Sequence, residues 1–394
     1  MELSVTYLNR KFLHPFVLAS APPTATGEMI ARAFDAGWAG AVVKTLIQEP
    51  VRNLHNRFAS NRLAGRIYGF ENIELLSELT PEEWFRDIRA LKRGYPDRIL
   101  IGSIMGTGAD KEPWLELALG CQEAGADLIE LNFSCPHGYP EKGQGAAIGQ
   151  NPVYSATITR WLKEDPRLRL PVIPKLTAAV TDISYIGEAA AEAGADGLSA
   201  INTIPSFMGF DLETLEPRPS VAGYSAAGGY SGPGIKPIAL RCVADLLRSP
   251  GLPVMACGGI SSGTDAAEFI LLGAPVMHIC TAVMLEGYGV LDRMREELAS
   301  FMERHGFTSI DAFLGLGLGR LRDFHQLDTS YRVRAVIDPD TCTGCGACYV
   351  SCRDAGYQAI TADGETVTVD EARCQGCSLC VHVCPTGAVQ LLEC

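Results

Sequence analysis

CTGCGACYVSC (342–352) and CQGCSLCVHVCP (374–385) are two cysteine runs that determine the fold of the C-terminal part of the chain. Each run has the spacing C-x2-C-x2-C-x3-C, and the second starts 32 residues after the first (374 − 342 = 32). Two-residue gaps let a tight loop place three thiolates around one [4Fe-4S] cluster, and the fourth cysteine of each run ligates the other cluster. The spacing therefore predicts two clusters with crosswise ligands.

The crosswise rule assigns four cysteines to each cluster. One cluster is expected on Cys342, Cys345, Cys348 and Cys384, and the other on Cys374, Cys377, Cys380 and Cys352. Structural zinc is an alternative, but it usually takes separated cysteine pairs or mixed Cys and His ligands. Disulfides need an oxidising compartment, and the N-terminus shows no signal-peptide pattern. We therefore expect a small α+β domain of the ferredoxin type with two [4Fe-4S] clusters.

Length and composition limit the kinds of protein that this chain can be. Its 394 residues, 47% hydrophobic and 20% charged, suffice for a large domain and a small one. The formal net charge of −13 disfavours nucleic acid or an anionic membrane as a partner. No apolar stretch reaches the length of about 20 residues that a membrane span needs. We expect a cytoplasmic protein, because that compartment keeps thiols reduced.

Short apolar segments alternate with amphipathic segments before the cysteine runs. The expected strands are 16–20, 39–45, 99–105, 127–132, 172–176, 197–202, 254–258 and 276–280. Eight strand–helix units match a TIM (β/α)8 barrel, which typically has about 250 residues. A doubly wound sheet is the alternative, but the regularity of the eight units favours closure. We expect the barrel over 1–305, a linker over 306–332 and the ferredoxin domain over 333–394.

Polar residues follow several expected strands, at the barrel end where TIM-barrel active sites form. Lys44 and Lys175 each follow an apolar strand, and a buried lysine needs an anionic or acceptor partner. Gly258 and Gly259 let backbone N–H groups approach a phosphate, and a helix after Ser262 would direct its N-terminus there. These features indicate a pocket for flavin mononucleotide (FMN). No GxGxxG fingerprint follows a strand, so the sequence indicates no NAD or FAD site.

Several motifs resemble those of one enzyme family. They are NFSCPHG (132–138), GQG (143–145), GQNP (149–152), GFENIE (69–74), GYSG (229–232) and IKPIAL (235–240). Together with the cysteine tail they resemble dihydropyrimidine dehydrogenase, and above all the FMN-containing subunit of the bacterial NAD-dependent two-subunit enzyme. This resemblance covers essentially the whole chain. Dihydroorotate dehydrogenases share the barrel and a related Ser-Cys-Pro loop, but they typically have Asn at the position of His137 and lack this tail.

The resemblance implies roles for individual residues. Cys135 would be the general acid, on a mobile loop over about 135–149. The implied substrate contacts are Asn72, Asn132, Ser134, Asn202 and Thr203. The implied FMN contacts are Ala19, Ser20, Lys44, Thr45, Asn72, Glu74, Asn132, Lys175, Asn202, Gly232, Gly258, Gly259, Cys280 and Thr281. Asparagine amides both donate and accept hydrogen bonds, which suits an uncharged pyrimidine.

The resemblance also implies an activity: the reversible reduction of uracil or thymine to the 5,6-dihydropyrimidine. Electrons would pass from an FAD- and NAD-binding partner flavoprotein through the clusters to FMN, with hydride transfer to C6 and a proton from Cys135 to C5. NAD(H) would bind only the partner subunit, in a heterotetramer. One alternative is a dihydroorotate dehydrogenase-like enzyme for another cyclic amide, although the matched substrate positions supply no additional cation for an orotate carboxylate. The other alternative is an electron carrier whose barrel is only a scaffold.

Overall fold

The structure, a computed structural model, describes residues 1–135 and 145–394. These residues form two compact units, Met1–Arg320 and Leu321–Cys394. The expected catalytic loop falls mostly in 136–144, so His137 and the glycine-rich part of that loop lie outside the described residues.

The beginning of the segment expected to be a linker lies within the first unit. The backbone N–H groups of Gly315 and Gly317 donate to the carbonyl oxygens of Ile270 and Leu271, at 2.9 and 2.7 Å. These hydrogen bonds attach the segment to the C-terminal end of a barrel helix, so the first unit continues to Arg320.

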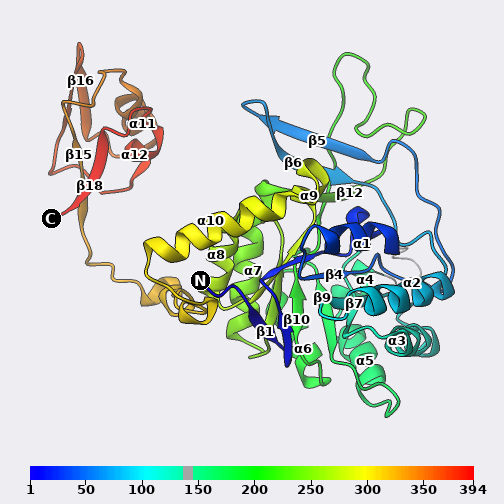
Figure 1. The fold of residues 1–394 in the computed structure, drawn as a ribbon. Coiled ribbons are helices and arrows are strands. Elements are labelled where there is room, and N and C mark those ends of the chain that lie inside the picture. Colours follow the sequence, from blue (N-terminus) through cyan, green and yellow to red (C-terminus); the bar gives the residue numbers. More distant parts are fainter. Residues whose placement is uncertain (136–144) are drawn as a thin grey trace. The chain divides into compact units, whose positions relative to one another are not determined.

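The first unit is a closed barrel of eight parallel strands (Figure 1). The strands are β3 (Phe16–Leu18), β4 (Gly40–Val42), β7 (Ile99–Ile104), β8 (Leu128–Asn132), β9 (Val172–Leu176), β10 (Leu198–Ala200), β13 (Val254–Cys257) and β14 (Val276–Ile279). The sheet closes in the order β10-β13-β14-β3-β4-β7-β8-β9. Each of the eight expected strands contains one of these barrel strands. The TIM-barrel prediction is confirmed, and the doubly wound alternative is wrong.

Helices cover the outside of the barrel, because their apolar faces pack on the buried strands. They are α1 (Gly27–Asp35), α2 (Pro81–Gly94), α3 (Glu112–Ala124), α5 (Pro152–Lys163), α6 (Ile183–Glu192), α7 (Lys236–Arg248), α8 (Gly263–Leu272) and α10 (Val290–Arg304). Two short helices, α4 (Ala146–Gly149) and α9 (Thr281–Glu286), lie in the connections that follow the carboxyl ends of β8 and β14. Short 3-10 helices of this unit are η1 (Pro22–Thr24), η3 (Pro233–Ile235), η4 (Ile310–Ala312) and η5 (Leu318–Arg320), and η6 (Phe324–Gln326) belongs to the second unit. Thr80 and Glu83 form a capping box at the start of α2, and Gly125 ends α3 in the left-handed conformation.

An antiparallel sheet that the sequence analysis did not predict lies beyond the barrel end that carries α9 (Figure 1). Its order is β11 (Ile204–Ser206), β12 (Gly228–Ser231), β6 (Arg66–Asn72) and β5 (Phe58–Leu63). The sheet joins the insertions after the β4 and β10 strands. It thereby brings Asn72 beside Gly229, although 157 positions separate them in the chain.

A two-stranded hairpin precedes the barrel, with β1 (Val5–Tyr7) paired to β2 (Arg10–Phe12). Tyr7 is buried, and its hydroxyl donates to the carbonyl oxygens of Leu198 and Pro253, at 3.3 and 3.2 Å. The hairpin therefore covers the amino ends of β10 and β13.

The second unit is a small α+β domain. Its elements are β15 (Val333–Ile337), α11 (Ala347–Ala355), β16 (Ile360–Asp363), β17 (Thr366–Val369), α12 (Leu379–Val383) and β18 (Val389–Glu393). β15 pairs with β18 and β16 pairs with β17, both antiparallel. Equivalent cysteines of the two runs, Cys348 and Cys380, are buried in one small core with Ala335, Ile360 and Val389.

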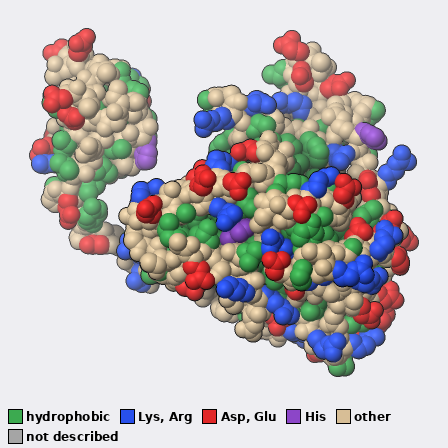
Figure 2. Space-filling model, viewed as in Figure 1, with side chains coloured by type: hydrophobic (Ala, Val, Ile, Leu, Met, Phe, Trp, Pro, Cys, Tyr) green, Lys and Arg blue, Asp and Glu red, His purple; other side chains and the backbone are tan. Residues whose placement is uncertain are grey.

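The surface carries charges of both signs. Lys and Arg side chains are interspersed with Asp and Glu over the face of the first unit that Figure 2 shows. Within the described residues, no helix is long and apolar enough to span a membrane.

Candidate active site and cluster sites

A cavity of about 780 Å³ lies at the carboxyl ends of the barrel strands. Pockets for small molecules and cofactors usually have about 300–1,000 Å³. Of the residues expected to contact FMN or substrate, those that line it are Ala19, Ser20, Lys44, Thr45, Asn72, Glu74, Asn132, Cys135, Lys175, Asn202, Thr203, Gly232, Gly258, Gly259, Cys280 and Thr281. Ser134 is the exception, because it is fully buried behind the cavity wall.

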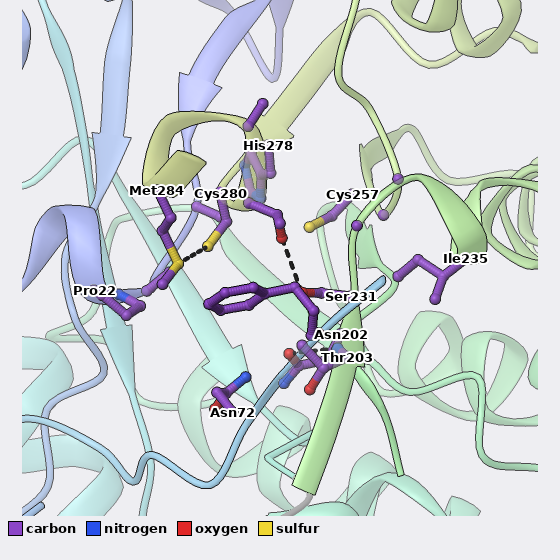
Figure 3. Close-up of a pocket in the computed structure, with 18 of the residues that line it drawn as sticks. Pro22, Asn72, Asn202, Thr203, Ser231, Ile235, Cys257, His278, Cys280 and Met284 are labelled. Atoms are coloured by element: carbon purple, nitrogen blue, oxygen red, sulfur yellow. Dashed lines mark hydrogen bonds between the residues drawn. The ribbon is translucent and has the colours of Figure 1, made fainter. Parts of the chain in front are cut away.

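A chain of hydrogen bonds fixes two of the asparagine amides. Asn202 Nδ2 donates to Ser134 Oγ at 3.0 Å, and that hydroxyl donates to Asn132 Oδ1 at 3.2 Å. Asn132 Nδ2 then donates to Thr45 Oγ1 at 2.9 Å. Figure 3 shows Asn202 and Thr203 on the same side of the cavity as Asn72. The amide groups are therefore held in set orientations by buried partners.

The third asparagine lies at the end of β6. Asn72 Nδ2 donates to the carbonyl oxygen of Gly229 at 3.3 Å, and Asn72 Oδ1 accepts from the backbone N–H of Glu74 at 3.3 Å. The Glu74 carboxylate lies 3.4 Å from Lys44 Nζ and 3.7 Å from Arg57 Nε. The first buried lysine thus has the anionic partner that its burial requires.

The second lysine is paired inside the barrel. Lys175 Nζ lies 3.9 Å from the carboxylate of Glu130, and both side chains are buried. Burial by itself lowers the pKa of Lys175, but the carboxylate of Glu130 raises it, and the net shift is upward. Burial, followed by the charge of Lys175, holds the pKa of His278 well below its ordinary value. At neutral pH Lys175 is therefore a cation and His278 is uncharged.

The loops after β13 and β14 form a cradle of backbone and hydroxyl groups. Gly259 has φ of +74°, and a Cβ there would lie 2.5 Å from the backbone nitrogen of Lys236. Ser262 caps α8, which begins at the next residue. Thr281 Oγ1 donates to Ser231 Oγ at 2.9 Å, and both residues line the cavity. Glycine backbone, a helix N-terminus and hydroxyls form the kind of donor set that holds a phosphate.

Cys280 begins the last part of this cradle. Its thiol lies 3.6 Å from Met284 Sδ in Figure 3. Burial is the main cause that raises the pKa of Cys280 to about 12. The side chain is therefore a neutral thiol at physiological pH. It gives the cavity an apolar wall at this point, which suits an aromatic ring system.

Cys135 follows β8 and lies in the cavity wall with only 6% of its surface exposed. Its carbonyl oxygen accepts a hydrogen bond from the backbone N–H of Ala146 at 3.0 Å. A Cβ at Gly145 would lie 2.5 Å from that oxygen, so the close approach requires glycine. Gly145 and Ala146, the first described residues after 136–144, therefore lie against the backbone of Cys135.

The eight cysteines of the two runs line two separate cavities in the second unit. One is lined by Cys342, Cys345, Cys348 and Cys384, and the other by Cys352, Cys374, Cys377 and Cys380. These are the two crosswise sets expected from the spacing. In the described part of the chain, no group of three or more His, Cys, Asp or Glu side chains is placed to hold a single metal ion. Four cysteines at each cavity match the number of protein ligands that a [4Fe-4S] cluster takes.

Backbone donors point at one sulfur of each cysteine run. The N–H of Ala359 lies 3.3 Å from Cys352 Sγ, and the N–H of Ala335 lies 3.5 Å from Cys374 Sγ. The hydroxyl of Thr386 is the main cause that lowers the pKa of Cys384. Such hydrogen bonds stabilise thiolates, which are the form that ligates iron.

Comparison with known proteins finds a family for each of the two units. Residues 2–302 match the dihydroorotate dehydrogenase family, and residues 335–391 match the 4Fe-4S dicluster domain. The chain is 39% identical over 407 residues to the NAD-dependent dihydropyrimidine dehydrogenase subunit PreA of Escherichia coli K12, covering 100% of this chain and 96% of that protein. The chain belongs to the family of PreA-type dihydropyrimidine dehydrogenase subunits. The resemblance expected from its motifs is confirmed.

Two other relatives show how the PreA-type chain relates to its neighbours. The chloroplastic dihydropyrimidine dehydrogenase (NADP(+)) of Arabidopsis thaliana is 39% identical over 331 residues, covering 80% of this chain and 77% of that protein. The catalytic subunit of dihydroorotate dehydrogenase B (NAD(+)) from Pyrococcus abyssi is 37% identical over 316 residues, covering 80% of this chain and 99% of that protein. The match to both the pyrimidine and the orotate enzymes makes the choice of substrate the central question for the site.

Some cavity residues of this PreA-type chain were missed by the sequence analysis. Phe58, Arg66 and Phe70 come from the β5–β6 hairpin, and Arg293 comes from α10. The hairpin has a recognisable signal in the turn at Ala64 and Gly65, both with positive φ. Arg293 has none, because it lies on the exposed side of a helical pattern and pairs with Glu286 and Glu297.

Proposed function

We propose that this chain reduces uracil and thymine, reversibly, to the 5,6-dihydropyrimidines. The observation that carries this proposal is the meeting of three asparagine side chains, Asn72, Asn132 and Asn202, with the thiol of Cys135 in one cavity that also holds two paired lysines. Asparagine amides match the alternating carbonyl and N–H groups of a pyrimidine without adding charge. Thr203 completes the proposed substrate contacts. Ser134, expected from the resemblance to touch the substrate, would act instead by holding the amides of Asn132 and Asn202.

The same cavity fits FMN. Gly232, Gly258, Gly259 and Thr281 would hold its phosphate end, and Ala19, Ser20, Thr45, Lys44, Lys175 and Cys280 would lie beside its ring. When bound, FMN supplies a hydride to C6 of the pyrimidine. Lys175 stays a cation because Glu130 faces it, so it can balance negative charge on the cofactor.

The residues of the chain would then hold the ring and supply the proton. As C6 accepts the hydride, negative charge develops toward C5 and the C4 carbonyl, where asparagine N–H groups stabilise it. Cys135 donates its thiol proton to C5. A thiol suits this role because an ordinary cysteine pKa of about 8.5 keeps it protonated near neutrality.

The eight cysteines would hold the two [4Fe-4S] clusters that bring electrons to this site, in the crosswise sets that line the two cavities. The relative from Escherichia coli is named as a subunit of an NAD-dependent enzyme. We propose that this chain likewise works with a separate flavoprotein that binds FAD and oxidises NADH, in a heterotetramer. Cluster-bound thiolates suit a reducing compartment such as the cytoplasm.

The test uses the full chain, purified anaerobically and loaded with FMN and iron–sulfur clusters. With reduced methyl viologen as donor it should consume uracil and thymine, and NADH alone should drive no turnover. Turnover with NADH alone would reject the partner. Reduction of orotate but not uracil would favour the dihydroorotate dehydrogenase alternative, and no reduction of any cyclic amide would favour the electron carrier.

A further inference from the structure

One buried carboxylate in the cavity wall is shared by two cations. Glu74 Oε1 lies 3.4 Å from Lys44 Nζ and 3.7 Å from Arg57 Nε. Lys44 and Glu74 are each only 8% exposed. Among the described residues, the second oxygen, Glu74 Oε2, is buried without a hydrogen-bond partner. A buried carboxylate oxygen without a donor points to a donor that the ligand supplies.

Glu74 lies next to the position proposed for the substrate. It follows Asn72 by two residues, its N–H donates to Asn72 Oδ1, and both side chains line the cavity. The Asn72 amide, which is proposed to bind the pyrimidine, therefore lies in the same turn as the Glu74 carboxylate.

The other charges at the cavity leave few cations for an anionic substrate. Lys175 faces Glu130, and Arg293 faces Glu286 and Glu297. Arg66 lies on the exposed part of β6. The other buried cation of the cavity is Lys44, and it already has Glu74 as its partner. A substrate carboxylate at this position would therefore be repelled by Glu74, and no unpaired buried cation of the described cavity wall would offset that repulsion.

We infer that Glu74 determines substrate specificity: it accepts a ring N–H from a neutral pyrimidine and repels a ring that carries a carboxylate, such as orotate. This inference rests on the proposed function. It adds a physical reason why a barrel of the dihydroorotate dehydrogenase family would bind orotate weakly. Specificity through a repulsive group is a common device, since an unpaired like charge penalises only the wrong ligand.

Replacing Glu74 would reverse the charge balance at this wall. Without the carboxylate, Lys44 and Arg57 would both lack their partner. The Arg57 side chain is about a third exposed and stacks over the ring of Phe58 at 5.1 Å, so it can stay in place without Glu74. The variant wall would then attract the carboxylate that the natural wall repels.

The experiment compares uracil and orotate in Glu74→Gln, with reduced methyl viologen as donor and FMN-loaded protein. The ratio of kcat/KM for uracil to kcat/KM for orotate should fall by about tenfold or more. Anaerobic titration with orotate, followed by the flavin absorbance, should show tighter binding than in the natural chain. Glu74→Met, which removes both charge and acceptor, should shift the ratio in the same direction if Glu74→Gln loses its flavin.

Glu71→Gln is the matched control. Glu71 lies on β6, three residues before Glu74. It is fully buried and also has an oxygen without a partner among the described residues, but it accepts from Ser206 and does not line the cavity. Its uracil-to-orotate ratio should match that of the natural chain. Adding Arg57→Gln to Glu74→Gln should remove part of the gain for orotate.

The two proposals fail in different ways. If the natural chain reduces neither uracil nor thymine, the proposed function is wrong. If the natural chain prefers uracil, and both Glu74 variants keep its ratio and its affinity for orotate, only the specificity role of Glu74 is wrong.

Discussion

The side-chain amide of Asn202 donates a hydrogen bond to the hydroxyl of Ser134 at 3.0 Å, which joins the carboxyl ends of β10 and β8. The same hydroxyl donates to Asn132 Oδ1 at 3.2 Å. Ser134 is fully buried and does not line the cavity. It thus orients two amides proposed to bind the substrate from behind the cavity wall.

We expect Ser134→Ala to weaken substrate binding more than it slows the chemical step. The change removes one hydrogen bond from each amide, worth about 1 kcal/mol apiece, so KM for uracil should rise by up to roughly 30-fold. Steady-state kinetics with an artificial donor measures this. Ser155→Ala is the control, because Ser155 is equally buried and donates to Ile148 O at 3.0 Å, away from the cavity. An equal KM change in both variants would contradict the positioning role.

Cys135→Ala tests the proposed proton donor. Loss of a general acid typically costs about 10²–10⁴ in rate, so uracil reduction should fall by that factor while FMN and clusters stay bound. Absorbance spectra report the cofactors, and turnover reports the chemistry. Cys121→Ala is the matched control, because Cys121 is fully buried in α3 and burial raises its pKa to about 12. Unchanged turnover in Cys135→Ala would reject the acid assignment.

The two cysteine cavities predict which cysteine substitutions disrupt the same cluster. Cys352 lies in the first run, but it lines the cavity of Cys374, Cys377 and Cys380. Cys352→Ser and Cys377→Ser should therefore disrupt the same cluster, and the double variant should lose no more iron than either single one.

The comparison pair for this test is Cys352→Ser with Cys345→Ser, two positions in one run but in different cavities. That double variant should lose both clusters. Iron content and electron paramagnetic resonance of the reduced protein distinguish the cases. If Cys352→Ser and Cys345→Ser, which lie in one run, instead disrupt the same cluster, the crosswise assignment is wrong.

Gly259→Ala should weaken FMN binding. An alanine there would have positive φ, which costs about 1–2 kcal/mol, and its Cβ would press on the backbone of Lys236 at 2.5 Å. FMN fluorescence titration of the apoprotein should show a clearly higher dissociation constant. Gly251→Ala is the control, since Gly251 also has positive φ but a Cβ there meets nothing within 4 Å. Equal FMN affinity in both variants would show that the loop of Gly259 does not contact the cofactor.

The barrel could be predicted from the sequence because its strands are continuous apolar segments separated by regular helices. The polar residues at the strand ends followed from this, since parallel strands place their carboxyl ends at one edge. The β5–β6 hairpin was missed because its strands are polar and partly exposed, so no apolar periodicity marks them. The contact of Arg57 with Glu74 could not be predicted, because only folding of that insertion brings a partly exposed arginine to the cavity wall.

His14 provides a pH test of the barrel that is independent of the active site. Its Nδ1 accepts the backbone N–H of Phe16 at 3.3 Å, so Nε2 must carry the hydrogen that is donated to the carbonyl oxygen of Gly37 at 2.9 Å. Protonation would put a second hydrogen on Nδ1 and break the first bond. Burial is the main cause that lowers the pKa of His14 to about 4.

This shift makes the first unit less stable in acid. The unfolded chain, with an ordinary histidine pKa of about 6.5, binds more protons than the folded chain between pH 4 and 6.5. Stability is therefore fully present above that window and falls as the pH drops through it, by about 2 kcal/mol between pH 7 and 5. Thermal unfolding at both pH values should show a smaller loss in His14→Gln than in the natural chain. His55→Gln, which changes an exposed histidine, should keep the natural pH dependence. An unchanged pH dependence in His14→Gln would mean that other groups cause the loss of stability in acid.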